Sequence, residues 1–114
     1  MEDCIFCKII AGEIPSSKVY ENEYVYAFKD IAPAAPVHIL VIPKKHIQNI
    51  TQVQPEDMVY VTEAVKAIQK IVKDEGIDET GYRTVINTGK DGGQTVEHLH
   101  FHVLGGRYLE WPPG

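Results

Sequence analysis

Residues 97–104 read Glu-His-Leu-His-Phe-His-Val-Leu, so three histidines alternate there with apolar residues. Successive side chains of a β-strand point to opposite faces of the sheet. The apolar residues would therefore face a core, and the imidazoles of His98, His100 and His102 would share the other face. Imidazole can exchange protons, attack phosphorus or bind a metal near neutral pH. The alternatives for this strand are incidental solvent-facing histidines or an incidental metal-binding tract.

The segment that leads into this strand is rich in turn-forming residues. Residues 87–95 read Asn-Thr-Gly-Lys-Asp-Gly-Gly-Gln-Thr. Glycine adopts backbone conformations closed to other residues, and successive bare backbone amides can form an anion-binding concavity. Alone, such a loop is more often a hairpin connection. Because it opens directly onto three same-face histidines, it predicts a phosphate site.

The remaining chain predicts an α+β fold. A short helix is expected over residues 4–10 with Asp3 as its N-cap, and a long helix begins at Pro55 and ends at Gly76 as the C-cap. Strands are expected over residues 19–20, 24–28, 38–42, 83–87 and 99–104. Together they predict an antiparallel sheet of about five strands with the long helix on one face and the histidines on the other, facing a shallow cleft. No repeat or linker interrupts residues 1–114, so we expect a single domain.

Composition limits the partners. Eleven basic and 16 acidic residues give a net charge of −5, which argues against a nucleic-acid polymer or an anionic membrane as the main partner. A small anionic ligand remains compatible with that charge. No apolar run approaches the roughly 20 residues of a membrane span. The Met-Glu-Asp-Cys start lacks the basic region and apolar stretch of a secretory signal, so we expect a cytoplasmic protein.

The pattern His-φ-His-φ-His-φ-φ, where φ is apolar, resembles the signature of the histidine triad (HIT) nucleotide hydrolases and transferases. The resemblance is closest to the HINT branch, the nucleoside phosphoramidase-like members. Further matching blocks lie at residues 5–10, 13–15, 28–31, 36–47, 92–95, 104–107 and 111–114. The resemblance implies a hydrolase that cleaves purine nucleoside 5′-monophosphate amides or esters through a nucleotidyl-histidine intermediate. The implied partner is a purine nucleotide of the AMP or GMP type, with no organic cofactor.

A central position in the row of histidines suits a nucleophile, because both neighbours then flank the reacting phosphate. We therefore expect His100 to attack the phosphorus, as the resemblance also implies, and His102 to bind the phosphate oxygens. The resemblance implies that Asp30 accepts hydrogen bonds from the ribose hydroxyls, although alone it is typical of a turn. It also gives roles at the nucleotide to the following residues: Ile9, Ile31, His38, Asn87, Gly93, Gln94 and Thr95, where the family commonly has serine. Phe6 and Phe28 are expected to be core residues whose ring edges are available to a purine. Without the resemblance, His38 on an apolar strand would be interpreted as a buried core histidine.

Cys4 and Cys7 form a Cys-x-x-Cys pair and are the only cysteines. A structural disulfide is not expected here, and two cysteines are a weak metal signal because tetrahedral zinc needs four ligands. The missing ligands would be His46 and His98, as in some microbial triad proteins. We therefore expect a structural Zn²⁺, with two free buried thiols or a catalytic zinc on the triad histidines as the alternatives.

The segment Trp111-Pro112-Pro113-Gly114 carries the only tryptophan. The resemblance implies a homodimer in which two sheets join edge to edge and each tail reaches toward the other subunit's site. A tail folded on its own subunit is the alternative. Two other functions remain open from the sequence: a nucleotide-binding interaction module with incidental turnover, and a dinucleoside polyphosphate hydrolase or nucleotidyltransferase.

Overall fold

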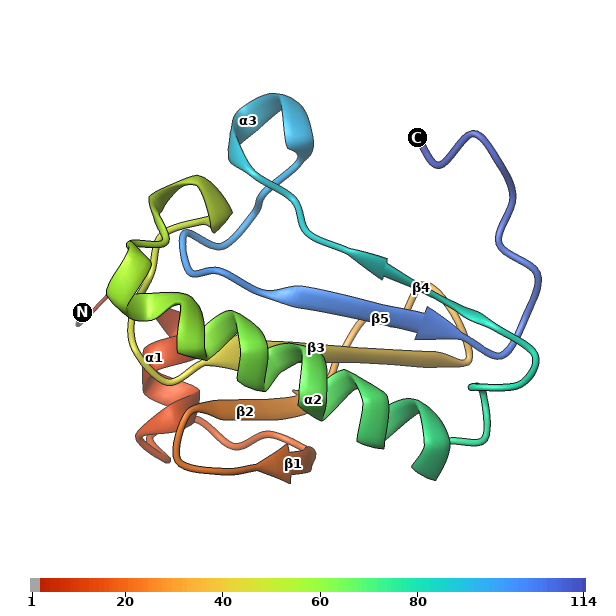
Figure 1. Ribbon diagram of the computed structural model, residues 1–114, viewed down its shortest axis with the longest axis horizontal. Helices are drawn as coiled ribbons and strands as arrows, with labels where there is room; N and C mark the ends of the chain where they lie inside the picture. The colour runs from red at the N-terminus through yellow and green to blue at the C-terminus, as the bar shows by residue number, and fades with distance from the viewer. Residues whose placement is uncertain (1–2) are drawn as a thin grey trace.

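The computed structural model describes residues 3–114 and confirms the α+β fold with a five-stranded antiparallel sheet (Figure 1). The strand order is β1-β2-β3-β5-β4. The elements are α1 (Ile5–Ile10), β1 (Lys18–Glu21), β2 (Val25–Lys29), β3 (Val37–Pro43), 3₁₀ turns at Ile50–Gln52 and Pro55–Asp57, α2 (Met58–Asp74), β4 (Tyr82–Val85), α3 (Gly89–Gly92) and β5 (Phe101–Gly105). Residues 1–2, on which the expectation about a secretory signal partly rests, lie outside the described residues.

The long helix α2 covers one face of the sheet (Figure 1). Its apolar residues recur at helical spacing and pack on alternate residues of β2, β3 and β5, including Phe101 and Val103, and on Leu99 just before β5, as predicted. The helix begins at Met58 rather than Pro55, because residues 55–57 form a 3₁₀ turn. Among residues 3–114, no helix combines the length and apolar character needed to cross a bilayer.

The opposite face of the sheet carries a second apolar cluster with α1. Phe6 and Ile9 of α1 pack there on Phe28 and on residues of β2 and β3. The N-cap of α1 is Cys4 rather than the predicted Asp3, because the Cys4 sulfur accepts the Cys7 N–H at 3.3 Å. This face also carries the histidines, so α1 and the histidine row share one side of the molecule.

Strand β5 starts later than predicted, so only His102 of the three histidines lies within it. His98 and His100 lie in the segment just before β5, where the Leu99 N–H donates to the Ile47 carbonyl at 2.7 Å. The alternation of faces nevertheless continues through this segment. Leu99 is buried against α2, whereas the ring of His100 lies edge-on to Phe6 with centroids 5.1 Å apart.

Candidate active site and metal centre

His100 presents one free ring nitrogen. Its Nδ1 lies 2.7 Å from the carbonyl oxygen of His98, and a carbonyl oxygen can only accept a hydrogen bond. The ring proton therefore sits on Nδ1, which leaves the lone pair of Nε2 available. The side chain is buried and its ring is held against Phe6. A fixed imidazole whose Nε2 is free of hydrogen-bond partners inside the ring's own segment is suited to nucleophilic attack through that nitrogen.

Two successive hydrogen bonds, from the Ala34 N–H to His38 and from His38 to His102, set which nitrogen of His102 is protonated. The backbone N–H of Ala34 donates to Nδ1 of His38 at 3.0 Å, so that nitrogen carries no proton. The proton of a neutral His38 ring must then sit on Nε2, which donates to Nδ1 of His102 at 2.9 Å. By the same reasoning, the proton of a neutral His102 sits on its Nε2. His102 is thus a hydrogen-bond donor through Nε2, next to the ring of His100.

The rings of His38 and His102 are both neutral near pH 7. Burial lowers the pKa of His38 below its usual value. Burial, together with the nearby rings of His100 and His38, lowers the pKa of His102 to about 4. The tautomers derived from the hydrogen bonds therefore hold across the neutral range.

Asp30 lies beside His38 at the start of the loop that joins β2 to β3. Its Oδ1 accepts the Ala32 N–H at 2.8 Å, and its Oδ2 lies 3.5 Å from Nε2 of His38. Asp30, His38 and His102 are close enough to be considered as a metal-binding group. The N–H of Ala34 argues against that use, because it keeps the proton of His38 on Nε2, where a metal would have to bind.

The 87–95 loop is more closed than predicted. Residues 89–92 form a turn of helix, α3, and Gly93 caps it with a left-handed φ of 78°. The N–H groups of Gly93 and Gln94 donate to carbonyls inside the loop, and the Gly89 N–H donates to Oε1 of Gln94. The prediction of bare amides is therefore wrong at these three positions.

Some side chains of the 87–95 loop hold its conformation through hydrogen bonds, and others are exposed to solvent. Gln94 donates both amide hydrogens to carbonyls, those of Gln48 and Val96, so its side chain holds the loop in place. Asn87 is half-buried just after β4, and Thr95 is exposed. The Thr95 hydroxyl is therefore the accessible polar side chain at the end of the loop that leads to the histidines.

The apolar residues predicted for the base pocket fall into two groups. Phe6, Ile9 and Phe28 come together in the α1 cluster and are nearly buried, whereas Ile31 is fully exposed and is not packed against them. Trp111 is also exposed, and its ring lies over the guanidinium of Arg83 on β4 at 6.0 Å. Arg83 also donates to the Leu109 and Glu110 carbonyls, which holds the tail on its own chain.

The two cysteines meet His46 and His98 in one cluster, which we call the metal cluster. All four potential ligand atoms lie within 4.8 Å of one another. Sulfur–nitrogen distances are 3.3 Å from Cys4 to His98, 3.4 Å from Cys7 to His46 and 3.6 Å from Cys7 to His98. Tetrahedral zinc with its usual bond lengths separates such atoms by about 3.5 Å. The donor set and its spacing therefore fit Zn²⁺.

Protonation at the metal cluster also fits a cation. Nε2 of His98 donates to the Pro43 carbonyl at 2.9 Å, which leaves the lone pair of Nδ1 directed at the sulfurs. Burial lowers the pKa of His98 to about 4. Burial and the neighbouring Cys4 raise the pKa of Cys7 to about 11, so two thiolates here need a positive charge between them.

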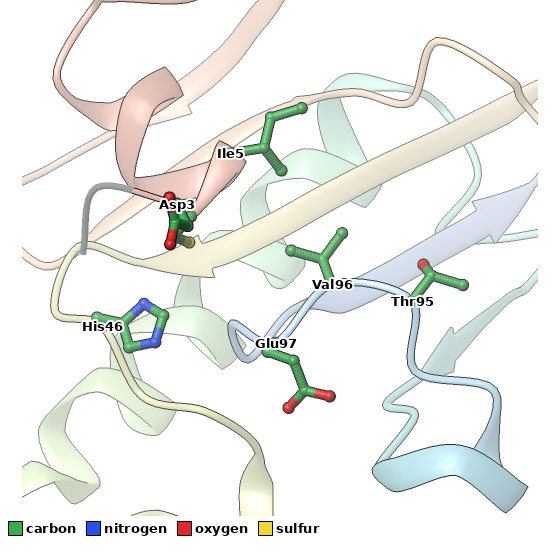
Figure 2. A pocket seen from close by; sticks show the side chains of 7 residues that line it. Asp3, Ile5, His46, Thr95, Val96 and Glu97 are labelled. Atoms are coloured by element: carbon green, nitrogen blue, oxygen red, sulfur yellow. The ribbon is translucent and has the colours of Figure 1, made fainter.

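An open hollow of about 800 Å³ lies beside the metal cluster, between α1 and residues 95–97. Figure 2 shows Asp3, His46 and Glu97 at one end of the hollow and Thr95 at the other. The side chains of Ile5 and Val96 also line it (Figure 2). The hollow therefore connects the surroundings of the metal cluster with the hydroxyl of Thr95.

Sequence reasoning did not identify the backbone groups that control the rings. The His98 carbonyl, the Pro43 carbonyl and the Ala34 N–H decide which nitrogen of each histidine is protonated. Backbone groups carry no residue-type signal, so only the fold reveals them. The Gly-Gly-Arg block at residues 105–107 is part of the family resemblance, but the sequence alone indicates no role for Arg107.

Comparison with known proteins is consistent with this geometry. The HIT domain model matches residues 11–109. An uncharacterized HIT-like protein of Synechococcus elongatus is 55% identical over 99% of this chain and 98% of its own length. A HIT family hydrolase of Legionella pneumophila superposes with a TM-score of 0.95 at 47% identity, covering 98% of this chain and 100% of that one. A histidine triad protein of Clostridium difficile gives 0.93 at 51% identity, covering 96% of each chain.

Proposed function

Since the chain belongs to the HIT domain family, we propose that it is a nucleotide-binding hydrolase of the phosphoramidase-like branch. Its substrates are purine nucleoside 5′-monophosphate amides or esters. One observation carries the proposal: the hydrogen bond from Nδ1 of His100 to the His98 carbonyl leaves Nε2 free to attack phosphorus. The similarity to a HIT family hydrolase of Legionella pneumophila supports hydrolysis as the reaction type.

The reaction proceeds in two displacements. Nε2 of His100 attacks the phosphorus, the bond from phosphorus to the leaving amine or alcohol breaks, and the leaving group takes a proton. Water then cleaves the nucleotidyl-histidine, which releases the nucleoside monophosphate and restores the ring. The Nε2–H of His102 donates to a phosphoryl oxygen as negative charge develops there. The exposed hydroxyl of Thr95 is the proposed proton donor to the leaving group, and it recovers a proton from the attacking water in the second displacement.

The nucleoside is bound by groups on the α1 side of the sheet. The partly exposed carboxylate of Asp30 can accept from both ribose hydroxyls, because only one of its oxygens is taken by a backbone N–H. Phe6, Ile9 and Phe28 provide an apolar floor for a purine, and the exposed side chain of Ile31 covers it once the base is bound. Asn87, Gly93 and Gln94 shape the loop beside the phosphate.

The proposal includes a structural Zn²⁺ held by Cys4, Cys7, His46 and His98. When bound there, the ion supplies a crosslink between the first turn of α1, the residues after β3 and the residues before β5. Those residues include His98, whose carbonyl holds the ring of His100. Metal ligation would therefore make the position of the nucleophile less mobile.

We further propose that the protein is a cytoplasmic homodimer. The exposed edge strand β4 and the exposed Trp111 support a pairing of two sheets with the tail directed at the partner's site. The bonds from Arg83 to the tail are compatible with this arrangement, because they hold the backbone and leave the indole exposed.

Replacing His100 tests the function directly. In His100→Ala and in the bulkier His100→Gln, hydrolysis of adenosine 5′-phosphoramidate should fall by about 10⁴-fold or more. AMP affinity, measured by calorimetry, should change by less than about tenfold. A screen of guanosine phosphoramidate and diadenosine polyphosphates against the wild type defines the substrate class. Turnover that survives in both variants would favour an interaction module with incidental hydrolysis.

A further inference from the structure

We infer that Arg107 is a positioning residue that fixes the protonation pattern of His102 through the loop of residues 30–36. The role of His102 toward phosphate rests on the proposed function, whereas the relay from Arg107 to the ring is a property of the folded chain. The relay has three links: the Arg107 guanidinium holds Ala34, Ala34 holds His38, and His38 holds His102.

The first link joins the end of β5 to the loop. Nη2 of Arg107 donates to the Ala34 carbonyl at 2.8 Å, and Nη1 donates to the Tyr108 carbonyl at 3.0 Å. Gly106 allows this approach, because it has a φ of 90° and a Cβ there would lie 2.9 Å from Cβ of Pro36. The backbone after β5 thus lies directly on the loop, with Arg107 at the loop's midpoint.

The second link passes through a single residue. The carbonyl of Ala34 is held by Arg107, while its N–H donates to Nδ1 of His38 at 3.0 Å. The beginning of the loop is tied separately, since the Asp30 N–H donates to the His38 carbonyl at 3.0 Å and Oδ1 of Asp30 accepts the Ala32 N–H. Those two hydrogen bonds hold Asp30 and Ala32 but do not involve the Ala34 peptide groups. The hydrogen bond from Arg107 to the Ala34 carbonyl therefore orients Ala34 from outside the loop.

The third link converts orientation into protonation. If the Ala34 N–H turned away, the proton of His38 could move to Nδ1, and Nε2 of His38 would then carry a lone pair. That lone pair would face Nδ1 of His102 at 2.9 Å, which is favourable only if His102 carries its proton on Nδ1. The Asp30 carboxylate, whose Oδ2 lies 3.5 Å from the same nitrogen, favours keeping the proton on Nε2, so the two tautomers would be mixed rather than fully exchanged. In the exchanged tautomer, His102 loses its Nε2–H, the hydrogen that it donates toward the site. A contact at Arg107 therefore controls a donor several side chains away.

Arg107 can be changed without opening the core, because its side chain is exposed. We would compare Arg107→Met and Arg107→Lys with the wild type. Arg83→Met is the matched control, since the Arg83 side chain also donates to two backbone carbonyls but, within residues 3–114, makes no hydrogen bond to the loop of residues 30–36. Two-bond ¹⁵N–¹H spectra of histidine-labelled protein at pH 7 distinguish protonated from unprotonated ring nitrogens.

In the wild type and in Arg83→Met, the spectra should show His38 and His102 protonated on Nε2. In Arg107→Met, both rings should show a mixture of tautomers, and Arg107→Lys should restore part of the original pattern. Unchanged spectra of His38 and His102 in Arg107→Met would overturn the inference, whatever the activity of that variant.

Kinetics give a second readout. Because a donor to developing charge acts mainly in the transition state, Arg107→Met should lower kcat by about tenfold with little change in KM, as losses of outer hydrogen-bonding partners do elsewhere. A rise in KM alone, with unchanged kcat, would contradict a role through His102. If the wild type proved inactive on phosphoramidates, the proposed function would fail while the spectra still tested the relay.

Discussion

Replacing Cys4 by serine is expected to remove zinc from the protein while keeping the first turn of α1 intact. Cys4 has two roles, since its sulfur caps α1 by accepting the Cys7 N–H and also lies 3.3 Å from Nδ1 of His98. Serine is a good N-cap, so Cys4→Ser keeps the first role. It removes the thiolate and leaves three ligands, which a structural zinc site does not tolerate well.

The size of the effect follows from ligand linkage. An ion present at about 1,000 times its dissociation constant stabilises the folded state by about 4 kcal/mol. For a chain of 114 residues, each kcal/mol moves Tm by about 4 °C. Stripping zinc from the wild type should therefore lower Tm by about 15 °C, and Cys4→Ser should start near this lower value.

The assay combines metal analysis with thermal melting, with and without a chelator. Wild type should contain one zinc per chain and respond to the chelator, whereas Cys4→Ser should contain little zinc and not respond. Cys7→Ser, which removes a ligand without touching the cap residue, should behave in the same way. Full zinc content in Cys4→Ser, or a wild-type Tm that the chelator leaves unchanged, would refute the four-ligand site.

Three further predictions address the cleft and the loop. Thr95→Ala should lower kcat for amide substrates by about tenfold or more while Thr95→Ser keeps it, and equal kinetics of the two would argue against a role for the hydroxyl. Folding lowers the pKa of His102 from 6.5 to about 4. Between these pH values the unfolded chain binds more protons than the folded chain, so the free energy of unfolding decreases as the pH falls from 6.5 toward 4. Urea unfolding should therefore show that the wild type loses about 1 kcal/mol more than His102→Asn from pH 7 to pH 5, whereas identical losses would contradict the shift. Gly106→Ala should destabilise the fold by about 1 kcal/mol more than Gly76→Ala, since both have positive φ but only at Gly106 would the new Cβ meet Pro36, and equal melting temperatures would speak against that contact.

The fold could be predicted largely from hydrophobic periodicity. Alternation over residues 97–104 placed Leu99, Phe101 and Val103 against α2, and the structure agrees. The start of β5 could not be read from the same pattern, because residues on either side of Phe101 keep alternating whether or not they pair with a neighbouring strand. Pairing depends on the position of β3 and β4, which periodicity within one segment does not contain.

The candidate site was predicted in its side chains but not in its protonation. The spacing of the histidines and the Cys-x-x-Cys pair, read with the family resemblance, identified residues that the fold does bring together. The bare amides of the 87–95 loop were predicted wrongly, since the Gln94 amide and the turn at Gly93 close that loop on itself. The tautomers of the histidine rings depend on backbone groups such as the Pro43 carbonyl, which lies 55 residues from His98 in the sequence. Local sequence patterns do not predict such contacts.

The nucleotidyl-histidine itself provides the most direct measurement. Wild-type protein mixed with adenosine 5′-phosphoramidate, quenched in alkali within one turnover and digested, should yield a peptide that carries one adenylyl group on Nε2 of His100. The adduct should form and disappear at rates that account for turnover. Steady hydrolysis with no adenylyl group on His100 at any quench time would contradict the account.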